Sequence, residues 1–165
     1  MRKILSAGNM KKNYNLLMDK ALAQAKLALT KNEVPIGAII VDAKGNILGR
    51  AYNKIEQTKN PAAHAEVLAI QKACKKIGDW RLNGCMIYVT LEPCLMCIGL
   101  IKLSRIEGVV FGAQSKLFGS GLTDSASCPS YTRNLKTISG IQKDKSVALL
   151  QAFFKQARKS RKEKK

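Results

Sequence analysis

The fold of this chain is constrained most by the way short apolar runs alternate with segments of helical periodicity. Five runs have the length and β-branched content of strands, at residues 34–41, 47–53, 86–91, 108–112 and, more weakly, 135–138. Four segments repeat apolar residues at helical spacing, at residues 13–30, 63–77, 94–103 and from 145 onward. Strands separated by helices of this length favour a sheet that is covered on both faces. The sequence therefore predicts a three-layer α/β/α sandwich around a sheet of about five strands.

We expect this sheet to be mixed, because its first two strands form a hairpin. Asp42-Ala43-Lys44-Gly45-Asn46 joins them and supplies turn residues. Pro35 and Gly37 fit only near the start of the first strand or at an edge. Residues 113–132 show no convincing period and are expected to form a loop.

The length and composition of the chain fit one domain. Of its 165 residues, 46% are hydrophobic and 24% charged, which suits a packed core and excludes a disordered chain or a small disulfide scaffold. No apolar run approaches the ~20 residues that cross a bilayer, and the N-terminal segment is too short for a secretory signal. We expect a cytoplasmic domain over residues 10–155, with a basic tail over 156–165. Residues 1–9 are expected to be a flexible extension, and either Met1 or Met10 is the start.

The charge of the chain indicates a polyanionic partner. Lysine and arginine number 29 against 11 acidic residues, which gives a net charge of +18. A domain this basic favours nucleic acid, with an anionic membrane as the main alternative and a merely solubilising surface as the plainer interpretation. The last eleven residues, 155–165, carry seven of the basic side chains. They form either a solvated helix end or a phosphate contact.

Two short segments bring together residue types that bind metals. Pro61-Ala62-Ala63-His64-Ala65-Glu66 holds the only histidine, and Leu91-Glu92-Pro93-Cys94-Leu95-Met96-Cys97 holds the only C-x-x-C. Two cysteines three apart lie on one face of a first helical turn, where free N–H groups and the helix dipole favour thiolates. One nitrogen and two sulfur donors suit zinc and leave a fourth position open for water. We expect one zinc ion per chain, with Cys74, Cys85 and Cys128 outside the ligand set.

Glu66 is expected to act as a base and not as a ligand. It follows His64 by two residues, so the two side chains do not share a lateral face of a helix. Both approach one metal ion only if the ion lies beyond the helix end, where Glu66 would then face the bound water. Taken singly, a C-x-x-C also fits a redox site or a core, and a lone histidine is usually structural. The combination H-x-E…P-C-x-x-C is the signature of zinc-dependent nucleobase deaminases, whereas a thioredoxin-type site leaves His64 and Pro93 unexplained.

With these motifs the chain resembles the cytidine-deaminase-like superfamily and, within it, the bacterial tRNA-specific adenosine deaminases. The resemblance runs over residues 16–112 and resumes at 149–155. Besides the two metal motifs it rests on Asn53 and on Glu33-Val34-Pro35-Ile36-Gly37-Ala38. It implies a homodimer that hydrolyses adenosine to inosine at the wobble position of a tRNA anticodon, with zinc as the cofactor.

The resemblance also assigns substrate contacts. Asn53 would bond the edge of the base, the backbone N–H of Ala65 would lie toward the departing group, and Val34 would form part of the pocket wall. On the RNA side we expect contacts from the last helix, namely Phe153, Phe154, Lys155 and Arg158. Core packing is the alternative for the two phenylalanines. Two segments depart from the usual family pattern, Gln114-Ser115-Lys116 and Thr132-Arg133-Asn134.

Two other functions use the same motifs. A deaminase of a free nucleobase or nucleoside, such as cytosine, guanine or cytidine, would need the same zinc site. The charge of +18 argues against it, because a free base brings no phosphates. A non-catalytic, zinc-stabilised RNA-binding module is a third possibility. Glu66 argues against that module, since structural zinc sites usually have four protein ligands.

Overall fold

The structure, a computed structural model, describes residues 7–119 and 135–163, and side chains from residue 13 onward within those ranges. Its elements in chain order are α1 (Ala7–Thr30), β1 (Gly37–Val41), β2 (Ile47–Tyr52), α2 (Ile55–Thr58), α3 (Ala65–Ile77), β3 (Met86–Leu91), α4 (Leu95–Leu103), β4 (Gly108–Ala113), β5 (Lys136–Ile138) and α5 (Lys143–Lys162). The strands form one sheet in the order β2-β1-β3-β4-β5. β1 pairs antiparallel with β2 and β3, whereas β3, β4 and β5 run parallel. The mixed five-stranded sheet is therefore confirmed.

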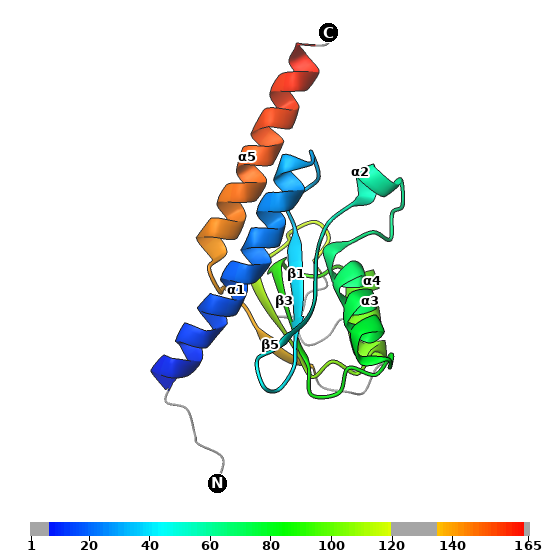
Figure 1. Cartoon of the computed structure of the whole chain (residues 1–165). Helices are drawn as coiled ribbons and strands as arrows, with labels where there is room; N and C mark the ends of the chain where they lie inside the picture. Colours follow the sequence, from blue (N-terminus) through cyan, green and yellow to red (C-terminus); the bar gives the residue numbers. More distant parts are fainter. Residues whose placement is uncertain (1–6, 120–134, 164–165) are drawn as a thin grey trace.

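Helices cover both faces of the sheet, as expected of a three-layer sandwich. α1 and α5 lie together on one face, and α3 and α4 lie on the other (Figure 1). Side chains that alternate along β1 enter two separate cores: Ile40 packs with α3 and α4, and Ile39 packs with α1. Because both faces are apolar, all five residues of β1 are buried.

β1 starts later than the sequence predicted, at Gly37 and not at residue 34. Residues 34–36 are coil instead of strand, because Pro35 has no N–H and the Ile36 N–H donates back to the Val34 carbonyl at 2.7 Å in a tight turn. The strand then passes directly under α1 at Gly37. A β-carbon at that position would collide with the Ala21 carbonyl, so only glycine allows this approach.

Two helices differ from the sequence prediction. α1 begins at Ala7 and not at residue 13, so residues 7–9 of the expected flexible extension are helical. The stretch contains no proline, and its lysines are good helix formers, which allows the helix to continue toward the N-terminus. The one-turn helix α2 was not predicted, because four residues are too short to show a period.

Several sequence expectations concern residues outside the described ranges. These are residues 1–6, Cys128, the segment Thr132-Arg133-Asn134 and the last two residues of the basic tail. The described part of the tail, through Lys162, continues α5. Among the helices described, none is both long and apolar enough to span a bilayer.

Candidate active site

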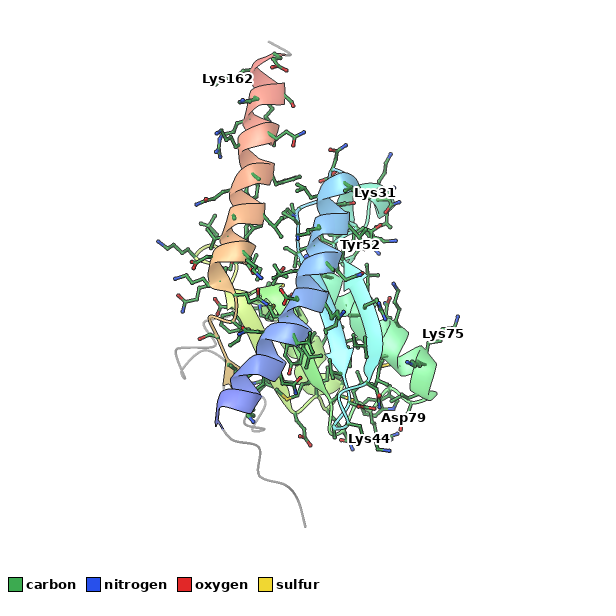
Figure 2. All side chains as sticks on the ribbon, turned by 60° about the vertical axis from the view of Figure 1, so that its left-hand side comes forward. Lys31, Lys44, Tyr52, Lys75, Asp79 and Lys162 are labelled. Carbon is green, nitrogen blue, oxygen red and sulfur yellow. The ribbon has the colours of Figure 1, made fainter. Side chains whose placement is uncertain are left out.

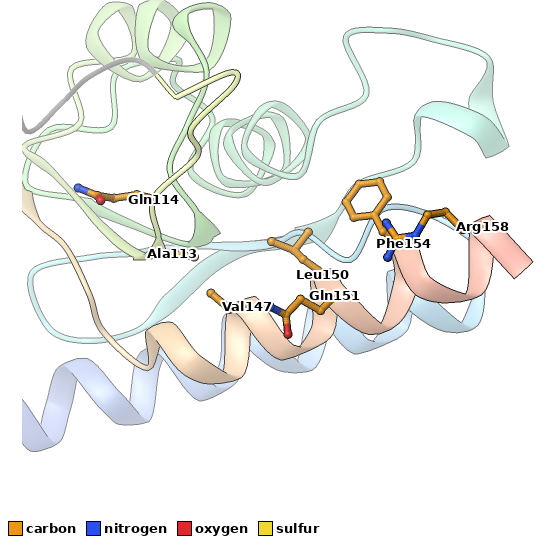
Figure 3. A pocket seen from close by; sticks show the side chains of 7 residues that line it. All are labelled: Ala113, Gln114, Val147, Leu150, Gln151, Phe154 and Arg158. Atoms are coloured by element: carbon orange, nitrogen blue, oxygen red, sulfur yellow. The ribbon is translucent and has the colours of Figure 1, made fainter.

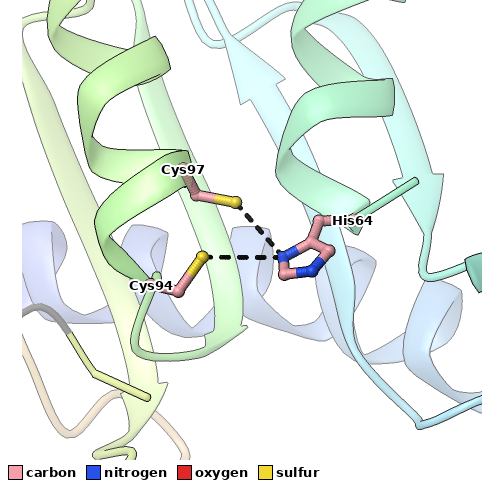
Figure 4. A group of neighbouring side chains, drawn as sticks. All are labelled: His64, Cys94 and Cys97. Carbon is pink, nitrogen blue, oxygen red and sulfur yellow. Dashed lines mark hydrogen bonds between the residues drawn. The ribbon is translucent and has the colours of Figure 1, made fainter. Parts of the chain in front are cut away.

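Three potential metal ligands meet at the starts of two helices. His64 immediately precedes α3, Cys94 immediately precedes α4, and Cys97 lies in the first turn of α4. Figure 4 shows the two sulfur atoms directed at one imidazole nitrogen. His64 Nδ1 lies 3.7 Å from Cys94 Sγ and 3.4 Å from Cys97 Sγ. The donor atoms of the three side chains all lie within 4.8 Å of one another, which makes this the metal-ligating group among the described residues.

These distances fit a tetrahedral zinc ion. Zinc–nitrogen bonds of about 2.1 Å and zinc–sulfur bonds of about 2.3 Å at tetrahedral angles put nitrogen and sulfur about 3.6 Å apart. The observed separations of 3.7 and 3.4 Å lie on either side of that value. One nitrogen and two sulfur donors are also a set that zinc prefers, and three protein ligands leave one position for water.

The local electrostatics favour a thiolate at this site. Hydrogen bonds with Cys97 and then with His64 lower the pKa of Cys94 to about 4. Cys97 is fully buried, and the nearby Cys94 sulfur raises its pKa. Because the two sulfurs share one site, the charge of one thiolate opposes ionisation of the other, and a divalent cation relieves that repulsion. Cys74 and Cys85 have free thiols outside this group.

Glu66 lies beside the ligands and is almost completely buried. Only 4% of the residue is exposed. Burial raises the pKa of its carboxyl group, which makes its carboxylate a stronger base than an exposed one. Its Oε2 atom has no hydrogen-bond partner among the described residues. A buried polar atom without a partner is costly, which indicates that a water molecule or a substrate completes its bonding.

One cavity of about 580 Å³ joins these residues to the expected substrate contacts. Its lining includes His64, Glu66, Cys94, Asn53 and Val34. It also includes residues that sequence reasoning did not predict as substrate contacts, together with the predicted Phe154. They are Ile36, Ile55, Leu91, Glu92, Ser115, Lys116, Leu117, Phe118 and Leu150. The volume and the mostly apolar wall suit a single nucleobase.

Comparison of the sequence with known proteins shows the family of this chain. Residues 11–113 match the family model described as the cytidine and deoxycytidylate deaminase zinc-binding region. The chain is also 44% identical over 149 residues to the tRNA-specific adenosine deaminase of Bacillus subtilis (strain 168), which covers 89% of this chain and 92% of that protein. The chain belongs to the tRNA-specific adenosine deaminase family. Membership confirms the zinc cofactor expected from the two motifs.

Two solved structures share the fold of this chain, and one of them comes from work on tRNA deaminases. A structure from a study of A-to-I editing by tRNA:A34 deaminases at the wobble position of transfer RNA is 35% identical, with a TM-score of 0.77. It covers 82% of this chain and 99% of its own. A guanine deaminase from Bacillus subtilis is 30% identical, with a TM-score of 0.59, and covers 73% of this chain and 81% of its own.

The residues expected to contact RNA lie on α5, and two of them, Phe154 and Arg158, line cavities in the described part of the chain. Phe154 forms part of the main pocket, and with Arg158 it lines a smaller neighbouring cavity of about 270 Å³ (Figure 3). Phe153 packs edge-on against Phe154, with ring centres 5.3 Å apart, and does not line either cavity. Lys155 is exposed. Of the four residues expected to contact RNA in this adenosine deaminase family member, Phe154 and Arg158 therefore lie closest to the base pocket.

Of the two expected substrate contacts Ala65 and Asn53, only Asn53 lines the main cavity. Ala65 is the fully buried first residue of α3, between His64 and Glu66, and does not line the main cavity. Asn53 follows β2 and is almost fully buried, with its side-chain amide bonded to Glu33.

Glu33 belongs to a motif that the sequence singled out, yet sequence reasoning gave it no role. The signal that could have found it is an acidic residue in an otherwise apolar pre-strand segment.

The segment after β4 forms the outer wall of the pocket. The Ser115 N–H donates to Glu92 Oε2 at 3.1 Å, which holds this segment against the end of β3. Leu117 and Phe118, which follow it, line the pocket although they are 86% and 76% exposed. Sequence reasoning predicted a loop here and noted Gln114-Ser115-Lys116 as a departure from the family pattern. It gave Leu117 and Phe118 no role, because a loop without periodicity does not reveal which way its side chains point.

Proposed function

We propose that this protein hydrolyses adenosine to inosine at the wobble position of a tRNA anticodon. The observation that carries the proposal is the buried Glu66 carboxylate, which lines one base-sized cavity together with His64, Cys94 and Asn53. The family's relatives that act on tRNA adenosine support the choice of substrate. The reaction consumes one water molecule and releases ammonia, so it needs a base that delivers protons as well as removing them.

The chain's own residues divide the chemistry between them. His64, Cys94 and Cys97 would hold the zinc ion, which acts as a Lewis acid and makes water a better nucleophile. Glu66 removes a proton from the attacking water as its oxygen adds to C6 of the purine. Glu66 passes this proton to the ring nitrogen, then takes the remaining proton from the hydroxyl group now bonded to C6 and gives it to the departing amine. The C6–N bond breaks, the C6 carbonyl forms, and the amine leaves as ammonia. The raised pKa of Glu66 suits both transfers, because the group must bind and release a proton in one turnover.

The basic surface supports an RNA substrate over a free base. α2 and the outer half of α5 lie at one end of the molecule, and α5 projects beyond the domain there (Figure 1). Lys31 and Lys162 lie toward the same end, whereas Lys44 and Asp79 lie at the opposite end (Figure 2). Lys116 adds a cation to the pocket wall. A flexible anticodon loop can place one base in the cavity while its phosphates contact these side chains.

Purified, zinc-loaded protein incubated with tRNA tests the proposal. Sequencing should reveal inosine at position 34 of an adenosine-bearing anticodon, and Glu66→Gln protein should leave that position unchanged. Free adenosine, guanine, cytosine and cytidine are compared at equal concentration. Faster release of ammonia from any of these than from an anticodon stem-loop would replace the proposal with a free-base deaminase. RNA binding without ammonia release would favour the non-catalytic module.

The exposed apolar face of α4 supports a homodimer. Leu95, Met96 and Leu103 are all exposed on this nine-residue helix, whose one charged residue is Lys102. A surface of this kind is suited to a second copy of the same helix, because two such faces bury each other's apolar side chains. Sedimentation velocity should give a dimer for the native protein and a monomer for Leu103→Glu. A monomeric native protein would exclude this assembly. We also propose a cytoplasmic location, because the proposed substrate is tRNA.

A further inference from the structure

Glu33 is a buried acidic residue that the proposed reaction does not use. It is 0% exposed and is one of seven polar or charged residues that are buried in the described part of the chain. Its carboxylate accepts three hydrogen bonds. Oε2 accepts from Asn53 Nδ2 at 3.2 Å and from the Glu56 N–H at 3.2 Å, and Oε1 accepts from the Gln57 N–H at 2.6 Å. A charge that deep in a domain needs such bonds, and their number shows that it is held in one position.

The backbone brings Glu33 to this position at the end of α1. Asn32 has a left-handed conformation with φ of 56°, and its N–H donates to the Leu29 carbonyl. The Glu33 N–H donates to the Ala28 carbonyl at 3.0 Å. This pair of bonds is a Schellman motif, which ends the helix and turns the next residue inward. Val34, which lines the pocket, follows directly.

The bonds from α2 hold the carboxylate, and the carboxylate in turn holds Asn53. The N–H groups of Glu56 and Gln57 belong to the first turn of α2, where backbone donors have no partner within the helix. They fix both oxygens of Glu33. The remaining bond reaches the side chain of Asn53, which lines the cavity beside Glu66.

We propose that Glu33 is a positioning residue that fixes the orientation of the Asn53 amide and so sets which edge of a base the pocket accepts. The inference rests on the proposed function, in which Asn53 contacts the base. An ionised carboxylate only accepts hydrogen bonds, so the Asn53 atom facing it must be the NH₂ group and not the carbonyl oxygen. The amide oxygen and the second N–H are thereby left, in a single arrangement, for the substrate. Without Glu33 the amide could rotate by half a turn and exchange its donor and acceptor.

Glu33→Gln is the direct test, because it keeps the size of the side chain and changes one acceptor into a donor. The new NH₂ group would face either the N–H of Gln57 or those of Glu56 and Asn53, so Asn53 is no longer held in one orientation. We expect kcat/KM for an anticodon stem-loop to fall by about 10- to 100-fold, mainly through KM, as is typical when a supporting hydrogen bond is lost. Zinc content should not change. Glu107→Gln is the matched control, since it makes the same change in an exposed side chain that does not line the pocket, and it should retain near-normal activity.

A double-mutant cycle distinguishes positioning from a general structural role. If Glu33 acts through Asn53, then Glu33→Gln should cost little further activity in an Asn53→Ala protein. An equal loss in both backgrounds, or kcat/KM within twofold of the native value for Glu33→Gln alone, would overturn the proposal.

Nuclear magnetic resonance provides a readout that needs neither catalysis nor a folded variant. In the native protein the side-chain amide protons of Asn53 should exchange with solvent far more slowly than those of the exposed Asn60. Equal exchange rates would refute the bond to Glu33 even if inosine forms normally. Conversely, slow exchange in a protein that forms no inosine would leave the positioning intact and reject the proposed function.

Discussion

Glu66 combines burial with an oxygen atom, Oε2, that has no hydrogen-bond partner among the described residues, and this combination determines what a substitution will do. The residue is 4% exposed and contributes to packing, yet it also lines the cavity beside the metal ligands. Replacing the carboxylate with an amide of the same shape should leave packing intact while removing the proton acceptor. The effect of such a change is therefore catalytic and not structural.

We expect Glu66→Gln to retain zinc and tRNA binding but to lose turnover by at least about 10²- to 10⁴-fold, the usual contribution of general acid–base catalysis. The reason is that one carboxylate serves more than one proton transfer. Single-turnover assays of inosine formation measure the loss, with metal content determined on the same sample. Activity within tenfold of the native protein would remove Glu66 from this role.

Substitution of a ligand cysteine and substitution of a cysteine outside the ligand group form a matched pair of tests. Cys94→Ser should lose most of the bound zinc, because serine is a poor ligand for this metal and only two protein donors remain. Cys74→Ser should retain one zinc ion per chain, since the Cys74 sulfur lies near the Trp80 carbonyl, 3.7 Å away, and outside the ligand group. Elemental analysis of both variants decides the matter. Loss of zinc from Cys74→Ser but not from Cys94→Ser would contradict the assignment.

Single residues also show how much of the candidate site could be predicted from the sequence. His64, Cys94 and Cys97 were predictable because metal ligation needs particular atoms at particular spacings, and the chain offers one histidine and one C-x-x-C. Glu33 was not predictable in the same way. Its role depends on α2 and Asn53 arriving beside it from 20 to 24 residues away, and only the folded backbone brings them there.

At the scale of elements, α5 joins the pocket to the outer surface. Residues Leu150, Phe154 and Arg158 follow one another at four-residue spacing, so they lie on one face of the helix, and that face lines a cavity. Lys155, Lys159 and Lys162 form an adjacent exposed row. One continuous helix therefore forms part of the base pocket and, beside it, an exposed basic surface.

Removal of residues 156–165 should weaken tRNA binding while leaving folding and zinc content unchanged. The described part of this segment is exposed apart from the half-buried Ala157, so its loss costs little packing. Each phosphate contact that is lost should reduce the log–log dependence of affinity on salt by about 0.7–0.9. Affinity measured over a range of salt concentrations gives that slope. An unchanged slope would show that the tail is merely solvated.

The elements that were predicted and those that were not differ in what stabilises them. β1, β3 and β4 are apolar runs whose burial could be recognised from composition. α2 is a single turn whose first N–H groups bond to Glu33, so its stability comes from a side chain distant in the sequence. The early start of α1 was missed because the apolar period that predicts this helix begins only at Leu16.

For the molecule as a whole, the metal site joins two parts of the chain that pack on the same face of the sheet. His64 and Cys94 are 30 residues apart, so a shared zinc ion cross-links the starts of α3 and α4. A ligand that binds only the folded chain stabilises it by mass action.

Chelation of zinc should therefore lower the melting temperature, and restoring zinc should reverse the change. The expected shift is several degrees, because binding at 100 times the dissociation constant is worth about 2.7 kcal/mol. Differential scanning calorimetry before and after dialysis against a chelator measures it. Cys94→Ser provides the control and should show no further decrease. An unchanged melting temperature in the native protein would mean that the site does not contribute to stability.

The metal ligands and Glu66 lie at the starts of α3 and α4, which rest on the sheet, whereas the outer wall comes from the segment after β4 and from α5. These two parts of the pocket can change independently during evolution or engineering. Substitution at Leu117, Phe118 or Phe154 can alter the accepted RNA without rebuilding the centre that performs hydrolysis. A library of variants at these three positions would change which RNA is recognised and leave the residues that perform hydrolysis unchanged.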